Sequence, residues 1–370
     1  MACGRLRVGV IFGGRSGEHE VSLISARSIL RALDPSRFEA VPIAITREGR
    51  WLLAGDALKA LEAGSTDLRG QPVALLGDPA CQGLVPLEGR GIAQQLDVVF
   101  PVLHGPHGED GTIQGLLELA NLPYVGAGVL GSALGMDKAV QKALLDHRGI
   151  PVADYIVVRD SVWRSAPDPL LDAVAARMGY PCFVKPANLG SSIGITKVKA
   201  PEALPAAIEL AFRYDRKALV EEAVAGREIE VSVLGNEEPE ASVCGEILPS
   251  REFYDYQAKY VDNSSRLIIP ADLPPEVSQE VRRLAVASFL ALEASGMARV
   301  DFLVALGPRR IIVNELNTIP GFTPISMYPK LWEASGVAYP ELITRLIELA
   351  LERHEAKLRL DTTYHHQPPG

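Results

Sequence analysis

The chain has 370 residues, which is too long for one ordinary domain and compatible with two or three. A hydrophobic fraction of 47% predicts packed cores and excludes a disordered protein. The net charge of -9, without a basic stripe, argues against nucleic-acid and anionic-membrane partners, because both require clustered Lys and Arg.

The N-terminus and the cysteines indicate the cellular compartment of the protein. The N-terminal apolar run is about five residues long, too short for a secretory signal or a membrane span. The four cysteines are far apart and form no CxxC pair, so neither a zinc site nor a disulfide framework is indicated. We therefore expect a cytoplasmic protein. Residues 361–370 lack periodicity and predict a flexible tail.

Alternating strands and helices predict an N-terminal α/β lobe over residues 1–126. Apolar spacings of 3, 4 and 3 from residue 23 indicate a helix that ends at Asp34 and Pro35. Such an order favours a parallel sheet covered by helices, whereas the weakly patterned residues 54–95 are assigned to a variable surface. The strands expected in this lobe are residues 7–12, 40–45 and 96–103.

Two further lobes are expected after a change of pattern near residues 126–135. The central lobe is placed at 127–225 and the C-terminal lobe at 226–360, both of the α+β class. The helices expected here are 138–147, 170–178, 202–212, 277–292 and 340–353. The strands expected here are 155–159, 182–186, 194–198, 218–222, 228–234, 299–304 and 311–317.

The strongest chemical signal is the pair of strands joined by Gly307 and Pro308. A turn centred near Pro308 places Asp301 opposite Glu315 and Arg299 opposite Asn317. Opposed carboxylates are destabilising unless a cation lies between them, and oxygen ligands favour a hard ion such as Mg²⁺. A solvated charged hairpin is the alternative, although it explains the apolar alternate residues less well.

A phosphate-binding pattern follows the strand at 182–186. Lys185 lies near the strand end, and the Gly-Ser-Ser-Ile-Gly turn at 190–194 can present backbone N–H groups to phosphate oxygens. The spacing matches neither GxxxxGK[ST] nor GxGxxG, so a P-loop and a dinucleotide-binding Rossmann motif are both weak interpretations. An ordinary hairpin turn is the alternative for this segment taken alone.

Two other segments indicate ligand contacts. The loop at 104–111 contains His104, His107, Glu109 and Asp110 and follows a buried strand, so we interpret it as a substrate-facing loop in preference to a zinc site. Lys138 opens a helix, where its charge opposes the helix dipole. An anionic ligand would account for that placement.

Together these segments resemble the D-alanine:D-alanine ligase family of ATP-grasp enzymes. The resemblance runs from about residue 7 to 350 with the motifs in the family's order. The matching segments are GGRSGEHEVS (13–22), HGPHGEDGTIQGLLE (104–118), GMDK (135–138), FVKPANLGSSIG (183–194), EFYDYQAKY (252–260), RVDF (299–302) and NELNTIPGFTPIS (314–326).

The resemblance implies a three-lobed ATP-grasp architecture of α/β and α+β class, with a Rossmann-like parallel-sheet N-terminal lobe. It also implies ATP-dependent ligation of two D-alanines through a D-alanyl phosphate, for peptidoglycan precursor synthesis. The implied cofactors are ATP and two Mg²⁺ ions, which Mn²⁺ can replace. The resemblance also implies a homodimer, and it implies that the ligands of the protein are small-molecule substrates.

Site residues follow from the same resemblance. Those matched to ATP are Lys138, Lys185, Ser191, Ser192, Glu221, Ala223, Val224, Glu228 and Lys259. Those matched to magnesium are Asp301, Glu315 and Asn317. Those matched to D-alanine are Glu18, His104, Lys259, Ser326 and Met327. Those matched to catalytic positions are Glu18, Ser191, Tyr260, Arg299 and Gly321.

The implied roles form a coherent reaction. Arg299 and the Gly321 N–H match the donors to the oxyanion that forms when the second amine attacks. Glu18, Ser191 and Tyr260 match a network that fastens the loop 250–266 over the site, which would exclude water from an acyl phosphate. We expect that loop to be mobile without nucleotide.

Three alternatives stay open. The same fold can form a D-alanyl-D-lactate ester, but the relatives that do so generally lack tyrosine at the position of Tyr260. Another ATP-grasp carboxylate–amine ligase is also compatible with the architecture. A noncatalytic ATP-binding module would be expected to lack a metal ligand or a phosphate lysine, and this sequence retains both.

Overall fold

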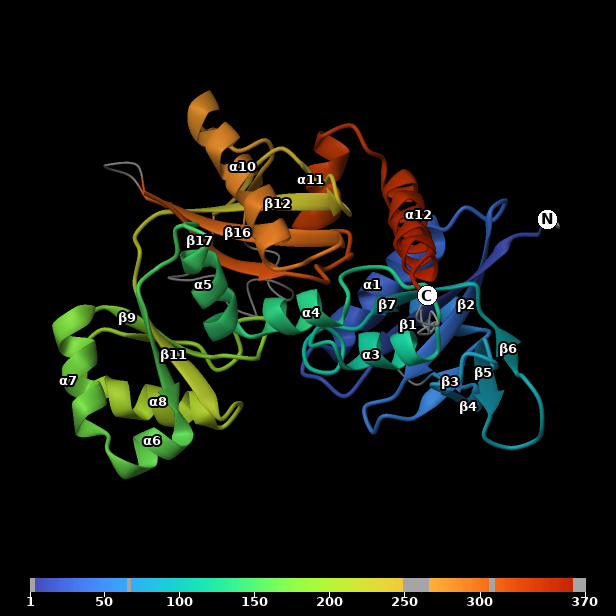
Figure 1. Cartoon of the computed structure of the whole chain (residues 1–370), viewed down its shortest axis with the longest axis horizontal. Coiled ribbons are helices and arrows are strands. Elements are labelled where there is room, and N and C mark those ends of the chain that lie inside the picture. Colours follow the sequence, from blue (N-terminus) through green and yellow to red (C-terminus); the bar gives the residue numbers. More distant parts are fainter. Residues whose placement is uncertain (1–3, 65–67, 249–265, 306–309, 362–370) are drawn as a thin grey trace, which may run out of the picture.

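The computed structural model describes residues 4–64, 68–248, 266–305 and 310–361 (Figure 1). Three sheets follow one another along the chain, and each is built from one of the three predicted lobes. The predicted boundaries at 126, 225 and 360 remain predictions. Within the described part of the chain, no helix is both long and apolar enough to cross a membrane.

The N-terminal sheet has seven strands in the order β6-β5-β4-β3-β2-β1-β7. β1 (Leu6–Gly13) pairs parallel with its two neighbours, β2 (Phe38–Ile45) and β7 (Val98–Val102), and Val99 of β7 makes a further parallel bridge with Tyr124. The remaining strands pair antiparallel, so the sheet is mixed. They are β3 (Trp51–Leu53), β4 (Gln71–Leu75), β5 (Gly83–Pro86) and β6 (Gln94–Gln95).

The assignment of residues 54–95 to a variable surface was wrong. The segment contains α2 (Ala57–Glu62) and the last three of these antiparallel strands. Its strands are short and bury few apolar side chains, among them Val73, Leu75 and Leu84. Backbone pairing to a preformed neighbouring strand stabilises them, and weak alternation does not reveal such pairing in a sequence.

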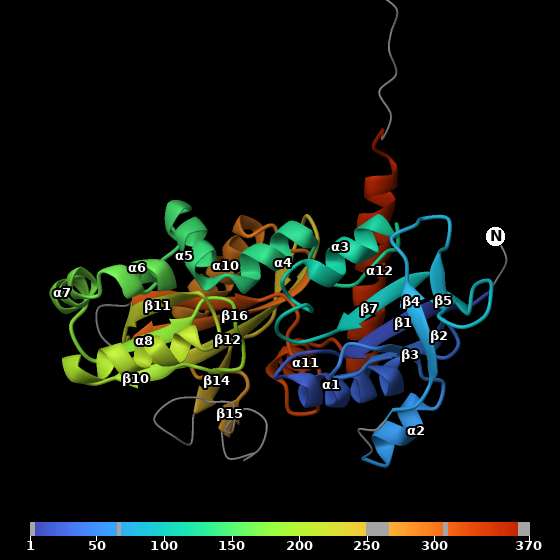
Figure 2. The same ribbon diagram turned by 90° about the horizontal axis from the view of Figure 1, so that it is seen from below.

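Helices cover both faces of the N-terminal sheet. On one face α1 (His19–Ala32) shares a core with the last helix of the described chain, α12 (Tyr339–Leu358). On the other face α3 (Thr112–Leu119) packs over a separate core. Figures 1 and 2 both show α12 beside α1 and β7. The C-terminal segment therefore closes the core of the first lobe.

The central lobe is a four-stranded antiparallel sheet in the order β10-β9-β11-β8. Its strands are β8 (Tyr155–Arg159), β9 (Cys182–Pro186), β10 (Thr196–Val198) and β11 (Lys217–Glu222). Its helices are α6 (Asp160–Ser165), α7 (Asp168–Arg177), the 3-10 turn Pro201–Ala203 and α8 (Leu204–Phe212). Apolar residues from these elements form a core of their own.

The C-terminal sheet runs β15-β14-β12-β16-β17, with β13 paired to β12. Its strands are β12 (Arg227–Gly235), β13 (Glu240–Ala241), β14 (Gly245–Leu248), β15 (Arg266–Ile268), β16 (Gly296–Ala305) and β17 (Arg310–Asn317). The helices α10 (Pro275–Ala291) and α11 (Met327–Ala334) pack against it.

Two helices connect the lobes, α4 (Val129–Met136) and α5 (Lys138–His147) (Figure 1). Asp137 caps α5 by accepting hydrogen bonds from the N–H groups of Ala139 and Val140, and it also contacts Lys217 of the central sheet. A carboxylate at this helix start stabilises it and offsets the unfavourable charge of Lys138.

Candidate active site

The hairpin of β16 and β17 has the predicted register where the chemistry lies. Asp301 is directly opposite Glu315, and Arg299 is opposite Asn317. A bulge follows, because Phe302 pairs with Val313 and leaves Asn314 as the extra residue. The bulge turns Val313 into the core, where it is fully buried. It also presents Asn314 toward the central lobe.

A third carboxylate extends this row. Glu230 of β12 lies directly opposite Asp301, so Glu230, Asp301 and Glu315 cross three neighbouring strands in line. Three aligned carboxylates repel one another unless cations lie among them. The pairing of β12 with β16 was beyond the sequence argument, which is why Glu230 was missed.

Arg299 supplies positive charge to this row. Its guanidinium donates two hydrogen bonds to Asp301, at 2.7 and 2.6 Å, and its Nε lies 3.0 Å from Glu230 Oε2. Asn317 Nδ2 also donates to Asp301, at 3.2 Å. Glu315 Oε2 lies 3.4 Å from Lys138 Nζ. Each of the two carboxylates predicted to bind magnesium therefore contacts a cationic side chain: Asp301 contacts Arg299, and Glu315 contacts Lys138.

These donors suit a hard cation. Among the described residues, no group of three or more His, Cys, Asp or Glu side chains is assembled closely enough to hold a metal by itself. Asp301, Glu315 and Asn317 instead offer two carboxylates and an amide. Such a small set of oxygen ligands fits Mg²⁺, which keeps several waters and takes further oxygens from phosphate.

Three lysines lie where the central lobe meets β17. Lys138 donates to the carbonyl oxygen of Leu189 at 2.8 Å. Lys185 contacts Glu221 Oε2 at 3.2 Å and donates to Asn314 Oδ1 at 3.3 Å. Lys142, which the sequence argument missed, lies 3.3 Å from the other oxygen of Glu221.

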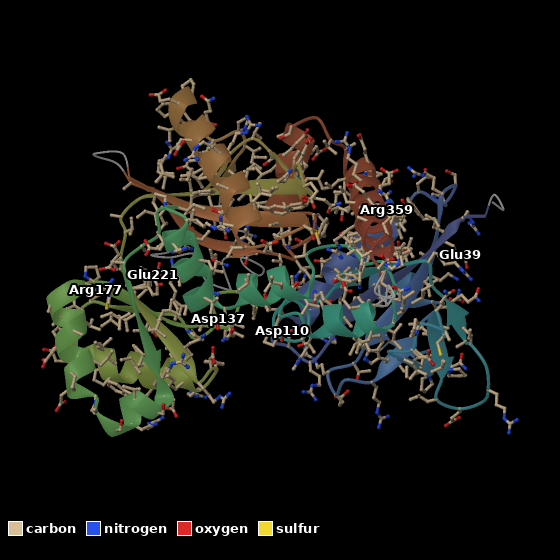
Figure 3. All side chains as sticks on the ribbon, in the orientation of Figure 1. Glu39, Asp110, Asp137, Arg177, Glu221 and Arg359 are labelled. Carbon is tan, nitrogen blue, oxygen red and sulfur yellow. The ribbon has the colours of Figure 1, made fainter. Side chains whose placement is uncertain are left out.

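Glu221 is nearly buried, and Figure 3 shows it at the junction of the central lobe and the C-terminal sheet. Burial alone would raise its pKa, but the ammonium groups of Lys142 and Lys185 outweigh burial and lower that pKa. Glu221 is therefore held as a carboxylate.

A cavity of about 490 Å³ lies between the central and C-terminal sheets. The predicted ATP and metal residues that line it are Lys185, Ser192, Glu221, Ala223, Val224, Glu228, Asp301 and Glu315. Ala223 and Val224 belong to the loop between β11 and β12, and Glu228 lies on β12. This volume suits a small-molecule ligand.

The Gly-Ser-Ser turn has an uncommon backbone. Ser191 and Ser192 have φ values of 51° and 57°, in the left-handed region that residues other than glycine rarely adopt. Each such residue costs roughly 1 kcal/mol or more and is typical of ligand-binding loops. The Ser191 hydroxyl donates a hydrogen bond to Glu18, so the turn is tied to the N-terminal lobe.

A second, smaller recess of about 60 Å³ adjoins the first cavity and shares Glu230 and Glu315 with it. The predicted substrate and catalytic residues that line it are Glu18, His104, Ser191, Arg299, Gly321, Ser326 and Met327, together with Asn317. They come from all three lobes. Most of the described predicted residues thus line a larger cavity or a small polar recess that meet at the hairpin, whereas Lys138 lines neither, and Ser191 and Asn317 line only the recess.

His104 is buried beside the recess. Its Nδ1 lies 3.1 Å from the carbonyl oxygen of Ile319 and 3.5 Å from Glu109, and its Nε2 lies 3.3 Å from the hydroxyl of Ser25. Burial alone would lower the pKa of His104, but Glu109, with help from Glu18, outweighs it and raises that pKa.

The segment after β17 packs tightly at the recess. The Ser326 hydroxyl accepts a hydrogen bond from Thr323 N at 3.0 Å, and a Cβ at Gly321 would approach that hydroxyl to 2.7 Å. Any side chain at Gly321 would therefore displace Ser326. Ser25, also missed from the sequence, accepts from Phe322 N at 3.2 Å and so links this segment to His104.

Lys259 and Tyr260 lie outside the described residues, as does almost all of the expected lid at 250–266. Their assignments remain predictions. The residues that sequence reasoning missed, Lys142, Glu230, Asn314 and Ser25, are all buried or paired across elements. No quoted motif contains Glu230 or Ser25, whereas Asn314 opens the matching segment 314–326 and Lys142 follows Lys138 by one helical turn, which is a usable signal.

Family models and curated relatives match most of the chain. The family model described as D-ala D-ala ligase N-terminus matches residues 7–127, and that described as D-ala D-ala ligase C-terminus matches residues 144–348. The D-alanine--D-alanine ligase of Geobacillus thermodenitrificans is 50% identical over 366 residues, covering 97% of this chain and 99% of the relative. That of Thermoanaerobacter sp. is 52% identical over 358 residues, covering 95% and 98%.

Solved structures are similar over nearly the whole chain. The D-alanine-D-alanine ligase from Coxiella burnetii has a TM-score of 0.83 and 39% identity, and 96% of each chain is covered. The VanG D-Ala:D-Ser ligase from Enterococcus faecalis has a TM-score of 0.83 and 38% identity, covering 94% of this chain and 100% of that one. The expected ATP-grasp fold is thereby confirmed, and the chain belongs to the D-alanine–D-alanine ligase family.

Proposed function

We propose that this chain uses ATP to join two D-alanines into D-alanyl-D-alanine, for peptidoglycan precursor synthesis, through a D-alanyl phosphate. The observation that carries the proposal is the meeting of the two cavities at the hairpin, where both are lined by Glu230 and Glu315. A phosphate donor in one cavity and a carboxylate in the other would react at that junction. The ligase names of the relatives support this choice of substrates.

The large cavity is assigned to ATP. Lys138 and Lys185 neutralise phosphate charge, while Ser191 and Ser192 present the turn to the same phosphates. Glu221 and the backbone of residues 223–224 bind the adenine side, and Glu228 binds the ribose. Lys259 is assigned to phosphate as well.

Asp301, Glu315 and Asn317 are the residues assigned to magnesium, with two ions proposed and Mn²⁺ as a substitute. When bound, the ions neutralise negative charge on the phosphates during phosphoryl transfer. Arg299 contacts Asp301 and also lines the recess, so the metal ligands and the proposed oxyanion donor are neighbours.

The recess is assigned to the two D-alanines. Glu18 anchors the ammonium group of the first D-alanine, and His104 lies beside it. Ser326, Met327 and Lys259 are assigned to the carboxylate end. Arg299 and the Gly321 N–H donate hydrogen bonds to the oxyanion that forms when the second amine attacks the acyl phosphate.

Water must be kept from the acyl phosphate. Ser191 joins Glu18 to the phosphate turn, and Tyr260 is the proposed third member of the network that fastens the loop 250–266. Closing the recess from three lobes at once would exclude solvent. We further propose that the enzyme is a cytoplasmic homodimer, which light scattering of the purified protein would test.

The direct test is phosphate release from ATP with D-alanine as the amino acid, compared with L-alanine, D-lactate and D-serine. We expect D-alanine alone to support fast release and a dipeptide product, verified by mass spectrometry. Faster product formation with D-alanine plus D-lactate would instead favour the ester-forming activity. ATP binding without release under any of these conditions would favour a noncatalytic module.

A further inference from the structure

Lys142 is a fully buried lysine outside the set assigned to ATP. It lies one turn after Lys138 on α5, and its side chain has 0% exposure. Its Nζ lies 3.3 Å from Glu221 Oε1 and donates to the carbonyl oxygen of Asn314 at 3.1 Å. Burying an ammonium group is costly unless it is paired, so this position requires an explanation.

Glu221 contacts two lysines that differ in their access to the large cavity. Its Oε1 faces Lys142 and its Oε2 faces Lys185, at 3.3 and 3.2 Å. Lys185 lines the large cavity and has 12% side-chain exposure, whereas Lys142 is enclosed behind Glu221 and Asn314. Only Lys185 of this pair can turn toward a ligand in the cavity.

Removing the counter-ion of a buried carboxylate costs free energy, because the carboxylate is then left charged and poorly hydrated. If Lys185 were the sole partner of Glu221, moving it to a phosphate would leave Glu221 uncompensated in a poorly hydrated place. The carboxylate and the phosphate would then compete for one ammonium group. Lys142 removes that competition because it stays with Glu221.

We propose that Lys142 is a positioning residue that stays paired with Glu221, so that Lys185 is available to the phosphates of the nucleotide. The inference rests on the proposed function, because it takes the large cavity to be the ATP site. It adds a residue that contacts no ligand but sets how strongly Lys185 binds one.

A purely structural role is the competing explanation. β17 is the edge strand of its sheet, and α5 satisfies its backbone with two neighbouring side chains. Gln141 donates to the carbonyl oxygen of Leu316 at 3.1 Å and accepts from Leu316 N at 3.0 Å, just as Lys142 donates to Asn314 O. Gln141 is therefore the matched control, since it is equally buried and docks the same strand without charge.

The experiment measures ATP and adenosine binding to the full chain by calorimetry. We expect Lys142→Met to weaken ATP binding at least about tenfold, the effect of leaving a buried charge with a single shared partner. Adenosine binding should weaken less than ATP binding, because adenosine contacts the assigned adenine side at Glu221 but has no phosphate for Lys185. Gln141→Met should leave the ratio of the two affinities as in the wild type.

A second pair of variants removes the charge itself. In Glu221→Gln the carboxylate no longer competes for Lys185, so adding Lys142→Met should weaken ATP binding no further. This double variant also lacks the unpaired buried charge that could prevent Lys142→Met from folding. Because Glu221→Gln alone leaves the ammonium group of Lys142 without a carboxylate, the ratio of ATP to adenosine affinity in the double variant is also compared with that in the wild type, which keeps the test decisive if a single variant is unfolded.

Three results would overturn the inference. They are unchanged ATP binding in folded Lys142→Met, equal loss of ATP and adenosine binding, and a tenfold further loss when Lys142→Met is added to Glu221→Gln. Failure of the wild type to bind ATP would instead refute the proposed function. The two failures are therefore distinguishable.

Discussion

Glu221 and Asp301 are both nearly buried carboxylates at the large cavity, but they are neutralised in different ways. Glu221 holds two lysines, of which Lys142 is enclosed and cannot leave. Asp301 holds the guanidinium of Arg299, a group with 16% side-chain exposure that also reaches Glu230. The cation at Glu221 is built in, whereas the cation at Asp301 belongs to a side chain with another proposed task.

Glu221 therefore has a countercharge that stays in place, Lys142, whereas Asp301 has one that can exchange, Arg299. A carboxylate has acceptor sites for both a metal ion and a guanidinium, but a metal ion at Asp301 would weaken the two hydrogen bonds that it accepts from Arg299. Glu230 offers the guanidinium an alternative partner 3.0 Å away, so the exchange need not leave Arg299 unpaired. We infer that the Asp301 side of the site is arranged to rearrange on loading, and the Glu221 side to stay.

The largest effect is expected at the metal ligands. Glu315→Gln should lower turnover by about a thousandfold or more, because it removes a charged oxygen ligand and several kcal/mol of phosphoryl-transfer stabilisation. The thermal midpoint should move little, since Glu315 contributes charge at the cavity and little packing. D-alanine-dependent phosphate release and thermal unfolding should be measured together. A nearly normal rate at saturating Mg²⁺ would contradict the metal assignment.

Glu230→Gln tests the exchange itself. Without this carboxylate Arg299 should stay on Asp301, and the Mg²⁺ affinity should fall about 10- to 100-fold, as is usual for partners of metal ligands. Calorimetric titration with Mg²⁺ in the presence of a nonhydrolysable ATP analogue reads the affinity independently of activity. Glu246→Gln is the control, because Glu246 is equally buried on the neighbouring strand β14 and pairs with Arg227. Equal losses in the two variants would mean that Glu230 has no special role.

Ser191→Ala tests whether the turn at residues 190–194 affects the binding of D-alanine and of ATP separately. The variant loses the hydroxyl that donates to Glu18, so the KM for D-alanine should rise about tenfold, the usual range for a hydrogen bond to a charged group. The KM for ATP should change less. The adjacent Ser192→Ala is the matched control and should act mainly on ATP, because Ser192 lines the nucleotide cavity. The reverse pattern would exchange the two assignments.

The smallest effect concerns pH and His104. The pKa of His104 is raised in the fold above its ordinary value of 6.5, so the protonated form stabilises the native state. This contribution is complete below about pH 6.5 and is lost as the pH rises through the folded pKa. The difference in unfolding free energy between the wild type and His104→Gln should therefore shrink between about pH 5 and pH 9. A difference that grows over this range would show that burial, which lowers the pKa, dominates over Glu109.

Much of the molecule follows from local sequence. Apolar patterning predicted elements in all three lobes, including α5 at the observed residues 138–147 and β9 at 182–186, but it did not predict the helix and strands within residues 54–95. The opposition of Asp301 to Glu315 was predicted from strand alternation and is observed, although the pairs nearer the turn, such as Ala305 with Arg310, lie one residue out of that register. These features are set by residues close together in the chain, so a short window of sequence contains the information.

Other features depend on contacts between distant segments. Short antiparallel strands within residues 54–95 form because a neighbouring strand is already present, and α12 buries its apolar face on a sheet more than two hundred residues earlier in the chain. The bulge at Asn314 shifts the register beyond Asp301, which no spacing rule foresaw. Family resemblance supplied the ligand roles, but it marked neither Lys142 nor Glu230.

The sequence alone predicted that Asp301 faces Glu315, because side chains alternate with a period of two along each strand, but the bulge at Asn314 is what brings these two residues opposite each other. Tertiary structure decided which cation neutralises each carboxylate. Lys142 reaches Glu221 only because α5 packs on the edge of β17, and Glu230 reaches Arg299 only because β12 pairs with β16. Burial makes those long-range pairings strong, since an ammonium or carboxylate removed from water must find its partner inside the protein.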